Sequence, residues 1–281
     1  QSQFMAGLGG EGNISTVSIL PSAFASSAEA RAGAGEYDLV VWGNCQVDGF
    51  DSLDLNFELV SSRSPVEVYE PPTFQAKGDV PSVVNIARGI VRYQHDDYLS
   101  ASEIFEALAG DVESDELPIF HANSLLFGGK YVEAETAYTA YLRADVSFAS
   151  AAYNNLGVAL NNRDVSIYKE PSLQGLAEFD RAVEISAADN PADIRNIDVG
   201  SIALFNRSRI HLLDGRYDDA LADCEAIRGI NSNSALSYVC LANYSMTRYR
   251  YNALNLPGRL PLGAIGQSLE DAEKRIPHPP I

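Results

Sequence analysis

The sequence contains few of the residues from which disulfide scaffolds and metal sites are built: among 281 residues there are three cysteines and four histidines. The cysteines, Cys45, Cys224 and Cys240, are too few and too irregularly spaced for a disulfide framework or a zinc site. We expect them to be small buried hydrophobic residues. A disulfide between Cys224 and Cys240 requires that their helices touch, and the sequence leaves this open.

Basic residues are also scarce, with 20 Lys and Arg against 38 Asp and Glu, a formal net charge of −18. Such a surface repels phosphate groups, so nucleic-acid binding is not expected. A basic partner would be tolerated, and the acidity also favours solubility. Long apolar runs are missing as well: no stretch of eighteen apolar residues occurs, so we predict no membrane span within this chain.

Motifs for catalysis or cofactor binding are missing too. None of the patterns HExxH, CxxC, GxSxG or a Walker loop occurs. The glycine-rich stretch 7–13 precedes the first expected strand instead of following it, so it does not match a phosphate-binding loop and is better explained as a flexible terminus. We therefore predict no catalytic residues, no cofactor-binding residues, no metal ligands and no enzymatic activity.

The first part of the chain has the pattern of a small α/β module. Residues 15–20 form a β-rich run, and the Ala-rich stretch 22–35 ends in glycines typical of a helix stop. Residues 38–47 are apolar enough for a buried strand, and 51–62 alternate between apolar and polar as a strand with one wet face does. A tight turn between the last two predicts a hairpin. The expected order is β-α-β-β.

A change of composition follows this module. Residues 64–81 carry four prolines and predict a largely extended linker. Strand patterns end after Pro81, and helical patterns continue from there. We therefore predict a small α/β module at 1–63, a Pro-rich linker at 64–81, and helical repeats with a C-terminal capping helix at 82–281.

Helical repeats are indicated by a phrase that the chain uses twice. Gly-x-Tyr-x-x-Ala occurs at 129–134 and again at 215–220. Positive φ angles are useful at Gly129 and Gly215, where the chain turns between helices. In register with these phrases, small residues mark the expected crossings of antiparallel helices: Gly89, Ala122, Gly157 and Ser208. A helix–turn–helix unit with a period near 34 residues predicts a helical solenoid.

The repeated phrase, the Leu-Gly pair at 156–157 and the aromatic residue that follows each Ala resemble the tetratricopeptide repeat family over roughly residues 82–250. The resemblance implies a mostly α fold, a solenoid of antiparallel helix pairs behind the small α/β module. Its first helices would line a concave groove. The sequence departs from the family pattern at 163–171, an insertion that we expect to be a loop.

Residues 36–49, between an Ala-rich helix and an alternating strand, resemble the TolB-like α/β module that precedes tetratricopeptide arrays in bacterial proteins. Because the chain begins with Gln1 and not with Met, we expect a fragment of a longer protein that holds part of this module. Localisation stays open between cytoplasmic and extracytoplasmic, and the resemblance favours a bacterial membrane-anchored or extracytoplasmic fragment.

The groove implied by the resemblance offers amide, apolar and cationic side chains. Asn hydrogen-bonds a peptide backbone in both directions, and Arg suits a carboxylate. The predicted partner-binding residues are Asn123, Phe127, Asn154, Val158, Asn162, Phe205, Arg209, Asn243 and Arg248. Asn155 and Asn206 also fit the clamp that some family members use for chaperone tails. Because Ile119 and Ile202 stand where that clamp has Lys, a chaperone-tail clamp is not expected.

These observations predict a non-enzymatic interaction scaffold that binds a protein or peptide segment in the groove, with self-association as a further possibility. The alternative is a regulatory or sensory subunit whose α/β module binds a small ligand and whose repeats contact an effector. A ligand bound to the module would favour the alternative.

Overall fold

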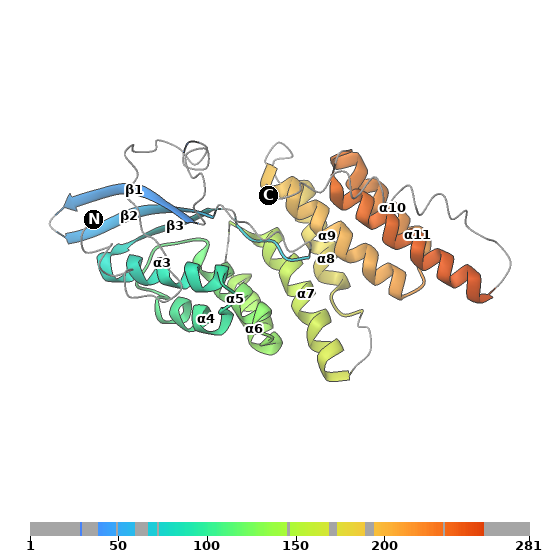
Figure 1. Ribbon diagram of the computed structural model, residues 1–281, viewed down its shortest axis with the longest axis horizontal. Helices are drawn as coiled ribbons and strands as arrows, with labels where there is room; N and C mark the ends of the chain where they lie inside the picture. Colours follow the sequence, from blue (N-terminus) through green and yellow to red (C-terminus); the bar gives the residue numbers. More distant parts are fainter. Residues whose placement is uncertain are drawn as a thin grey trace. The chain divides into compact units, whose positions relative to one another are not determined.

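The computed structural model describes residues 29, 39–48, 50–59, 67–71, 73–144, 147–168, 173–188, 194–232 and 234–255 (Figure 1). Apart from the helical residue Glu29, the predicted first strand and helix at 15–35 lie outside this range, as does the predicted capping helix. The chain divides into two compact units: residues up to 64 with 70–148, and residues 65–69 with 149 onward. Each unit is described by itself.

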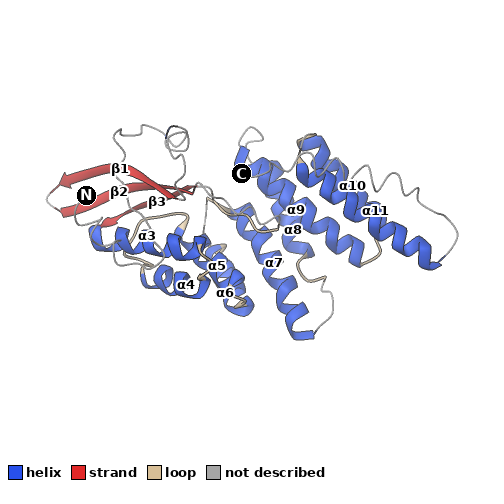
Figure 2. Cartoon of the chain, viewed as in Figure 1, coloured by secondary structure: helices blue, strands red, loops and turns tan. Residues whose placement is uncertain are grey.

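The first unit contains the strands and the first two helix pairs. Its elements are β1 (Leu39–Asp48), β2 (Phe50–Leu59), β3 (Thr73–Asp79), α3 (Val80–Gln94), α4 (Tyr98–Ala107), α5 (Leu117–Phe127) and α6 (Tyr131–Tyr141). The three strands form an antiparallel sheet in the order β1-β2-β3. Among the described residues, strands occur only in this part of the chain (Figure 2). The predicted hairpin of β1 and β2 is confirmed.

The third strand corrects the predicted linker. Residues 73–79, which the sequence assigned to an extended linker over 64–81, pair with β2 so that Phe74 lies opposite Phe57. The loop after α4 adds one more backbone pair, between Lys77 and Glu113, within a range that was predicted to be entirely helical. The sheet therefore includes a strand that the sequence assigned to the linker.

The junction between β3 and α3 is set by local chemistry. Asp79 caps the helix by accepting a hydrogen bond of 2.8 Å from the backbone N–H of Ser82. Hydrogen bonds from the Ser82 side chain and from this backbone N–H lower the pKa of Asp79. Pro81 follows in the first turn, where a missing N–H costs nothing. The helix then packs on β2 and β3, and buried Phe74 lies 5.3 Å from Phe120 of α5, ring centre to ring centre.

The second unit is helical in its described part. Its elements are α7 (Ala149–Tyr168), α8 (Leu176–Ala188), α9 (Ile194–Leu213), α10 (Tyr217–Ile230) and α11 (Ala235–Asn255). Each helix packs on the next, as Figure 1 shows. The first helices of successive pairs also touch, α7 with α9 and α9 with α11. The predicted solenoid of helix pairs is confirmed, and its first helices share one face.

The predicted loop at 163–171 is wrong for its first part, because α7 continues to Tyr168. Between Arg163 and Pro171 the chain has no Pro or Gly, so no helix-breaking residue ends the helix within the predicted loop before Pro171. Arg163 and the buried Asp164 form an ion pair of 3.0 Å within this extension. Arg163 also donates a hydrogen bond of 2.8 Å to Gln174.

The crossings of the helix pairs occur at the small residues that the repeat pattern marked. A Cβ atom added to Gly89 would lie 2.5 Å from the ring of Phe105, and one added to Gly157 would lie 2.6 Å from the ring of Phe179. Both distances are shorter than any ordinary contact, so only glycine fits. In each case the aromatic residue comes from the second helix of the pair.

The turns between paired helices also repeat. Gly129 and Gly215 both have φ of 75°, as the sequence predicted. Each of these glycines stands two residues before the tyrosine that begins the second helix of its pair. In the first pair, Asp96 occupies this position, with φ of 64°. Asp96 accepts a hydrogen bond of 2.6 Å from Tyr98. Asp tolerates this backbone region better than most residues, which explains its use here.

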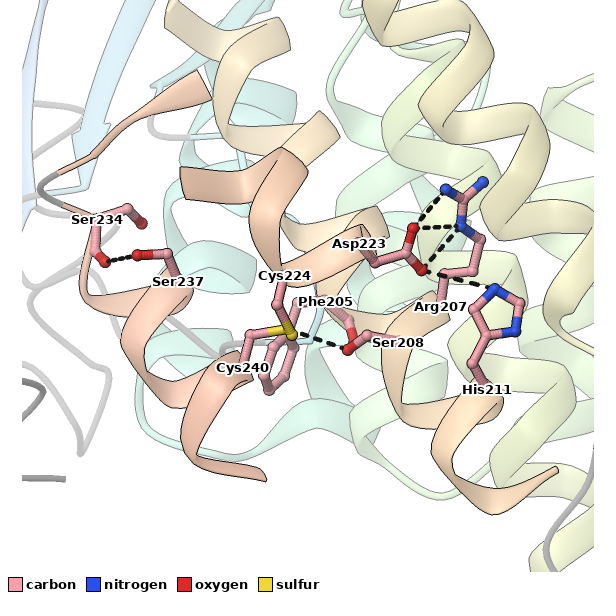
Figure 3. Close-up of a disulfide and its surroundings, with 9 residues drawn as sticks. All are labelled: Phe205, Arg207, Ser208, His211, Asp223, Cys224, Ser234, Ser237 and Cys240. Atoms are coloured by element: carbon pink, nitrogen blue, oxygen red, sulfur yellow. Dashed lines mark hydrogen bonds and ion pairs between the residues drawn. A yellow bond between two sulfur atoms is a disulfide. The ribbon is translucent and has the colours of Figure 1, made fainter. Parts of the chain in front are cut away.

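A disulfide joins Cys224 of α10 to Cys240 of α11, which settles the pairing that the sequence left open (Figure 3). Cys224 follows Tyr217 by seven residues, as Phe105 follows Tyr98. Phe105 contacts Phe120 of the next first helix at 6.2 Å between ring centres. The disulfide therefore takes the place of an aromatic contact between consecutive repeats.

Close to the disulfide, a buried charge cluster ties α9 to its neighbours (Figure 3). Arg207 donates to Asp223 of α10 at 2.6 Å and to Asp180 of α8 at 2.7 Å. Asp223 is buried and lies 3.6 Å from His211, whose pKa is lowered mainly by burial. Removing Arg207 would leave the buried Asp223 carboxylate without its guanidinium partner, so the cluster fixes the packing of α9.

We predict that Gly157→Leu lowers the free energy of unfolding by at least about 1–3 kcal/mol, because the added side chain overlaps Phe179. Gly229→Ala in α10 is the matched control. Nothing lies within 4 Å of its added Cβ, so a gain of about 0.4–1 kcal/mol is expected from the reduced freedom of the unfolded chain. Urea unfolding of both variants measures the difference, and equal stabilities would contradict the crossing geometry.

We also predict that reducing the disulfide, or replacing both cysteines by Ala, lowers the free energy of unfolding by about 3 kcal/mol. The bond closes a loop with a sequence separation of 16, and its loss returns chain entropy to the unfolded state. Thermal unfolding with and without a reductant measures the effect. The reductant should leave the double variant unchanged, and an equally stable reduced wild type would show that the bond contributes nothing.

Candidate functional site

The first helices of the second unit hold a short irregular piece of the same chain, which bends at Glu67 and Val68. Glu67, Val68 and Tyr69 belong to this unit although they stand about eighty residues before α7. Val68 and Tyr69 are buried, with 4% and 6% of their surface exposed. We call Glu67–Tyr69 the bound segment. Its contacts come from α7 and α9 and define the candidate site.

The side chain of Asn155 on α7 pairs with both backbone groups of Tyr69. Its Oδ1 accepts from the Tyr69 N–H at 2.8 Å, and its Nδ2 donates to the Tyr69 carbonyl at 2.9 Å. Asn155 has no exposed surface. A side-chain amide thus reproduces the donor and acceptor pair of a neighbouring β-strand, which is a means of recognising backbone whatever the side chain.

Two further asparagines complete a ladder across α7 and α9. Asn154 and Asn206 both donate through Nδ2 to the carbonyl of Glu67, at 3.0 and 2.7 Å. Asn206 also donates to Asn154, which in turn donates to Asn155. Every amide in this series is oriented by the next. The ladder is buried and holds the backbone of the bound segment at two residues, Glu67 and Tyr69.

The charged contact comes from Arg209, which lies about one turn after Asn206 on α9. Its guanidinium forms an ion pair with the carboxylate of Glu67 and lies 5.9 Å from the centre of the Phe205 ring. Both charged side chains are 41% exposed. An exposed pair of this kind contributes about 0–1 kcal/mol, so it favours an acidic residue at this position only modestly.

Three of the predicted site residues take part in this arrangement. Asn154 and Arg209 contact the bound segment, and Phe205 lies beneath Arg209 in a small core with the disulfide. Val158 is buried and Asn162 half-buried, further along α7. These positions on one helix follow the spacing from which the groove was predicted.

The other predicted residues lie elsewhere. Asn243 and Arg248 are half-buried on α11, and Arg248 lies 4.9 Å from the centre of the Tyr217 ring. Asn123 and Phe127 belong to α5 in the first unit. Asn123 is fully buried and accepts a hydrogen bond from Tyr138, whereas Phe127 packs on Tyr98 at 5.1 Å between ring centres. The predicted list is thus divided between two compact units, and its role in partner binding stays a prediction.

The sequence prediction missed the occupant and two of its three amide contacts. Asn155 and Asn206 were considered for a chaperone-tail clamp and set aside because the accompanying lysines are missing. The available signal was the Pro-rich stretch at 64–81, whose extended backbone is the kind of ligand that asparagines bind. A linker and a ligand have the same composition, so sequence alone does not distinguish them.

The described residues offer little for other chemistry. No group of three or more His, Cys, Asp or Glu among them is arranged to hold a metal ion. None of the described helices combines the length and the apolar composition that a membrane span requires. The asparagine amides and the guanidinium contact the bound segment through hydrogen bonds and one ion pair.

Comparison with known proteins supports this assignment of the repeats. Residues 121–191, from α5 to just beyond α8, match a family model described as tetratricopeptide repeat. No curated protein is significantly similar to the chain. The match does not reach the N-terminal part, so the resemblance of residues 36–49 to a TolB-like module stays a prediction.

We predict that Asn155→Ala exposes the bound segment. The Tyr69 N–H and carbonyl lose their partner, which costs about 1–3 kcal/mol where the groups stay buried. Amide exchange at Tyr69, followed by NMR, should become at least tenfold faster. Asn162→Ala, two turns along the same helix, is the control and should leave Tyr69 unchanged. Equal exchange in all three proteins would show that the ladder does not hold the segment.

Proposed function

Because the chain contains tetratricopeptide repeats, which form a protein–protein interaction module, we propose that its second unit binds a short segment of a partner protein along α7 and α9. The observation that carries this proposal is the pairing of Asn155 with both backbone groups of Tyr69. A surface that binds one backbone in this way offers the same hydrogen bonds to another.

The chemistry of the site supports a non-enzymatic scaffold. Its polar contacts go to backbone groups and to one carboxylate, and neither kind of contact involves a reactive side chain. The net charge of −18 argues against nucleic acid as the partner. Arg209 is a cation in this acidic molecule, so it favours a partner segment with an acidic residue.

The alternative of a sensory subunit stays a hypothesis. It requires a small-molecule site in the α/β module, whose predicted first strand and helix lie outside the described residues. The repeats are compatible with either role. The peptide-binding proposal is preferred because it is supported by specific contacts in the second unit.

We expect a library of extended peptides, presented to the full chain, to yield ligands whose affinity depends on the asparagine ladder. Asn206→Ala removes the contact to a ligand carbonyl and should weaken binding about tenfold, as expected for one or two buried hydrogen bonds. Asp219→Asn, on an exposed residue of α10, is the control and should not change affinity. Fluorescence anisotropy measures both.

A salt series separates groove binding from attraction to the acidic surface. Binding through the buried ladder should change little between low and physiological salt, whereas attraction between exposed charges is screened over about 8–10 Å. Ligands that lose affinity steeply with salt, yet bind Asn206→Ala as tightly as the wild type, would refute the proposal.

A further inference from the structure

The candidate site is filled by the chain itself, and this has a consequence for its ligands. The bound segment makes four backbone hydrogen bonds with three asparagines and one ion pair with Arg209. These contacts use the donors and acceptors that the proposed function assigns to a partner. A partner segment and the bound segment therefore require the same atoms.

We infer that Glu67–Tyr69 is an internal ligand, and that the partner recognised in its place is a peptide with an acidic residue two positions before the residue held by Asn155. This inference rests on the proposed function and specifies its ligand. The spacing follows from the contacts, because Glu67 meets Arg209 with its side chain and Tyr69 meets Asn155 with its backbone.

The acidic position is determined by charge. Arg209 faces Glu67 on the open side of the site, where both groups are 41% exposed and accessible to an incoming side chain. The second position is determined by backbone: its N–H and carbonyl must both be free, which excludes proline there. In addition, the backbone carbonyl of the acidic residue itself must accept hydrogen bonds from Asn154 and Asn206.

Competition within the chain lowers the apparent affinity of such a peptide. A tethered competitor acts at an effective concentration on the order of millimolar. If the segment itself has an intrinsic Kd of about 100 µM, about one molecule in ten has an empty groove, so a free peptide binds about tenfold more weakly than to a chain without the segment. Releasing the bound segment should restore this tenfold.

The test uses the full chain and a labelled peptide with the sequence of residues 64–72, SPVEVYEPP. Tyr69→Pro removes the backbone N–H that donates a hydrogen bond to Asn155. The segment is thereby released, while the groove residues stay intact. Tyr69→Phe keeps the backbone contacts and is the matched control. We expect the Tyr69→Pro chain to bind the peptide at least tenfold more tightly than the wild type and the Tyr69→Phe chain.

The charge requirement is tested by exchange. A peptide with Lys in place of Glu67 should bind the Tyr69→Pro chain more weakly. An additional Arg209→Glu substitution should reverse the preference, because the ion pair is restored with its signs exchanged. Equal binding of the Glu and Lys peptides by both proteins would refute the acidic position.

The outcomes separate the two proposals. Equal affinity of the wild type and the Tyr69→Pro chain, both weakened by Asn206→Ala, would refute the internal ligand and leave the peptide-binding groove. No binding by a Tyr69→Pro chain that is folded by circular dichroism would refute both. A dimer that Tyr69→Pro dissociates would place the segment in the groove of a second copy, which also refutes the internal ligand.

A second measurement decides the question if Tyr69→Pro does not fold. The Tyr69 amide of the wild type should be protected from hydrogen exchange, and excess peptide should remove this protection as it displaces the segment. Protection that excess peptide leaves unchanged, or an amide that is unprotected from the start, would overturn the inference.

Discussion

The close crossing of the two helices in each repeat is the constraint on which the rest of the helical structure depends. Gly89 and Gly157 leave room for the rings of Phe105 and Phe179, so the paired helices approach at a distance that no side chain on the glycine would permit. Once the pairs are closed in this way, the first helices α7, α9 and α11 come into contact in succession. Residues from neighbouring repeats thereby share one face. The asparagine ladder spans α7 and α9 and requires this contact.

The features that repeat could be predicted from the sequence, because each is produced by residues close together in the chain. The tyrosines at the start of second helices and the positive φ angles at Gly129 and Gly215 belong to this group. Where a repeat solves the same problem with another residue, the pattern is harder to see. Asp96 takes the left-handed position through its tolerance of that backbone, and Cys224 replaces an aromatic residue by a covalent bond to the next repeat. Both follow the register of the repeat once the register is known.

The sequence predictions that failed concern features formed by residues far apart in the chain. Strand β3 is flanked by prolines, and its pairing with β2 across more than ten intervening residues leaves no local signal. The site shows the same limit. Helical period predicts that one of two adjacent asparagines faces a groove, yet both Asn154 and Asn155 hold the bound segment, at the carbonyl of Glu67 and at both backbone groups of Tyr69. The direct hydrogen bond between the two asparagines orients both amides toward the segment.

Recognition of backbone by side-chain amides has a cost in selectivity, because almost every residue presents the same N–H and carbonyl. Selectivity must then come from the side chains of the ligand, and here the charged contact is the exposed pair of Arg209 and Glu67. An exposed ion pair contributes about 0–1 kcal/mol, which discriminates poorly between free ligands. Covalent attachment removes this weakness for the bound segment, since a tether supplies an effective concentration on the order of millimolar without any new contact. A modest set of contacts therefore suffices to hold the chain's own segment, whereas a partner must either reach high local concentration or add contacts beyond these three residues.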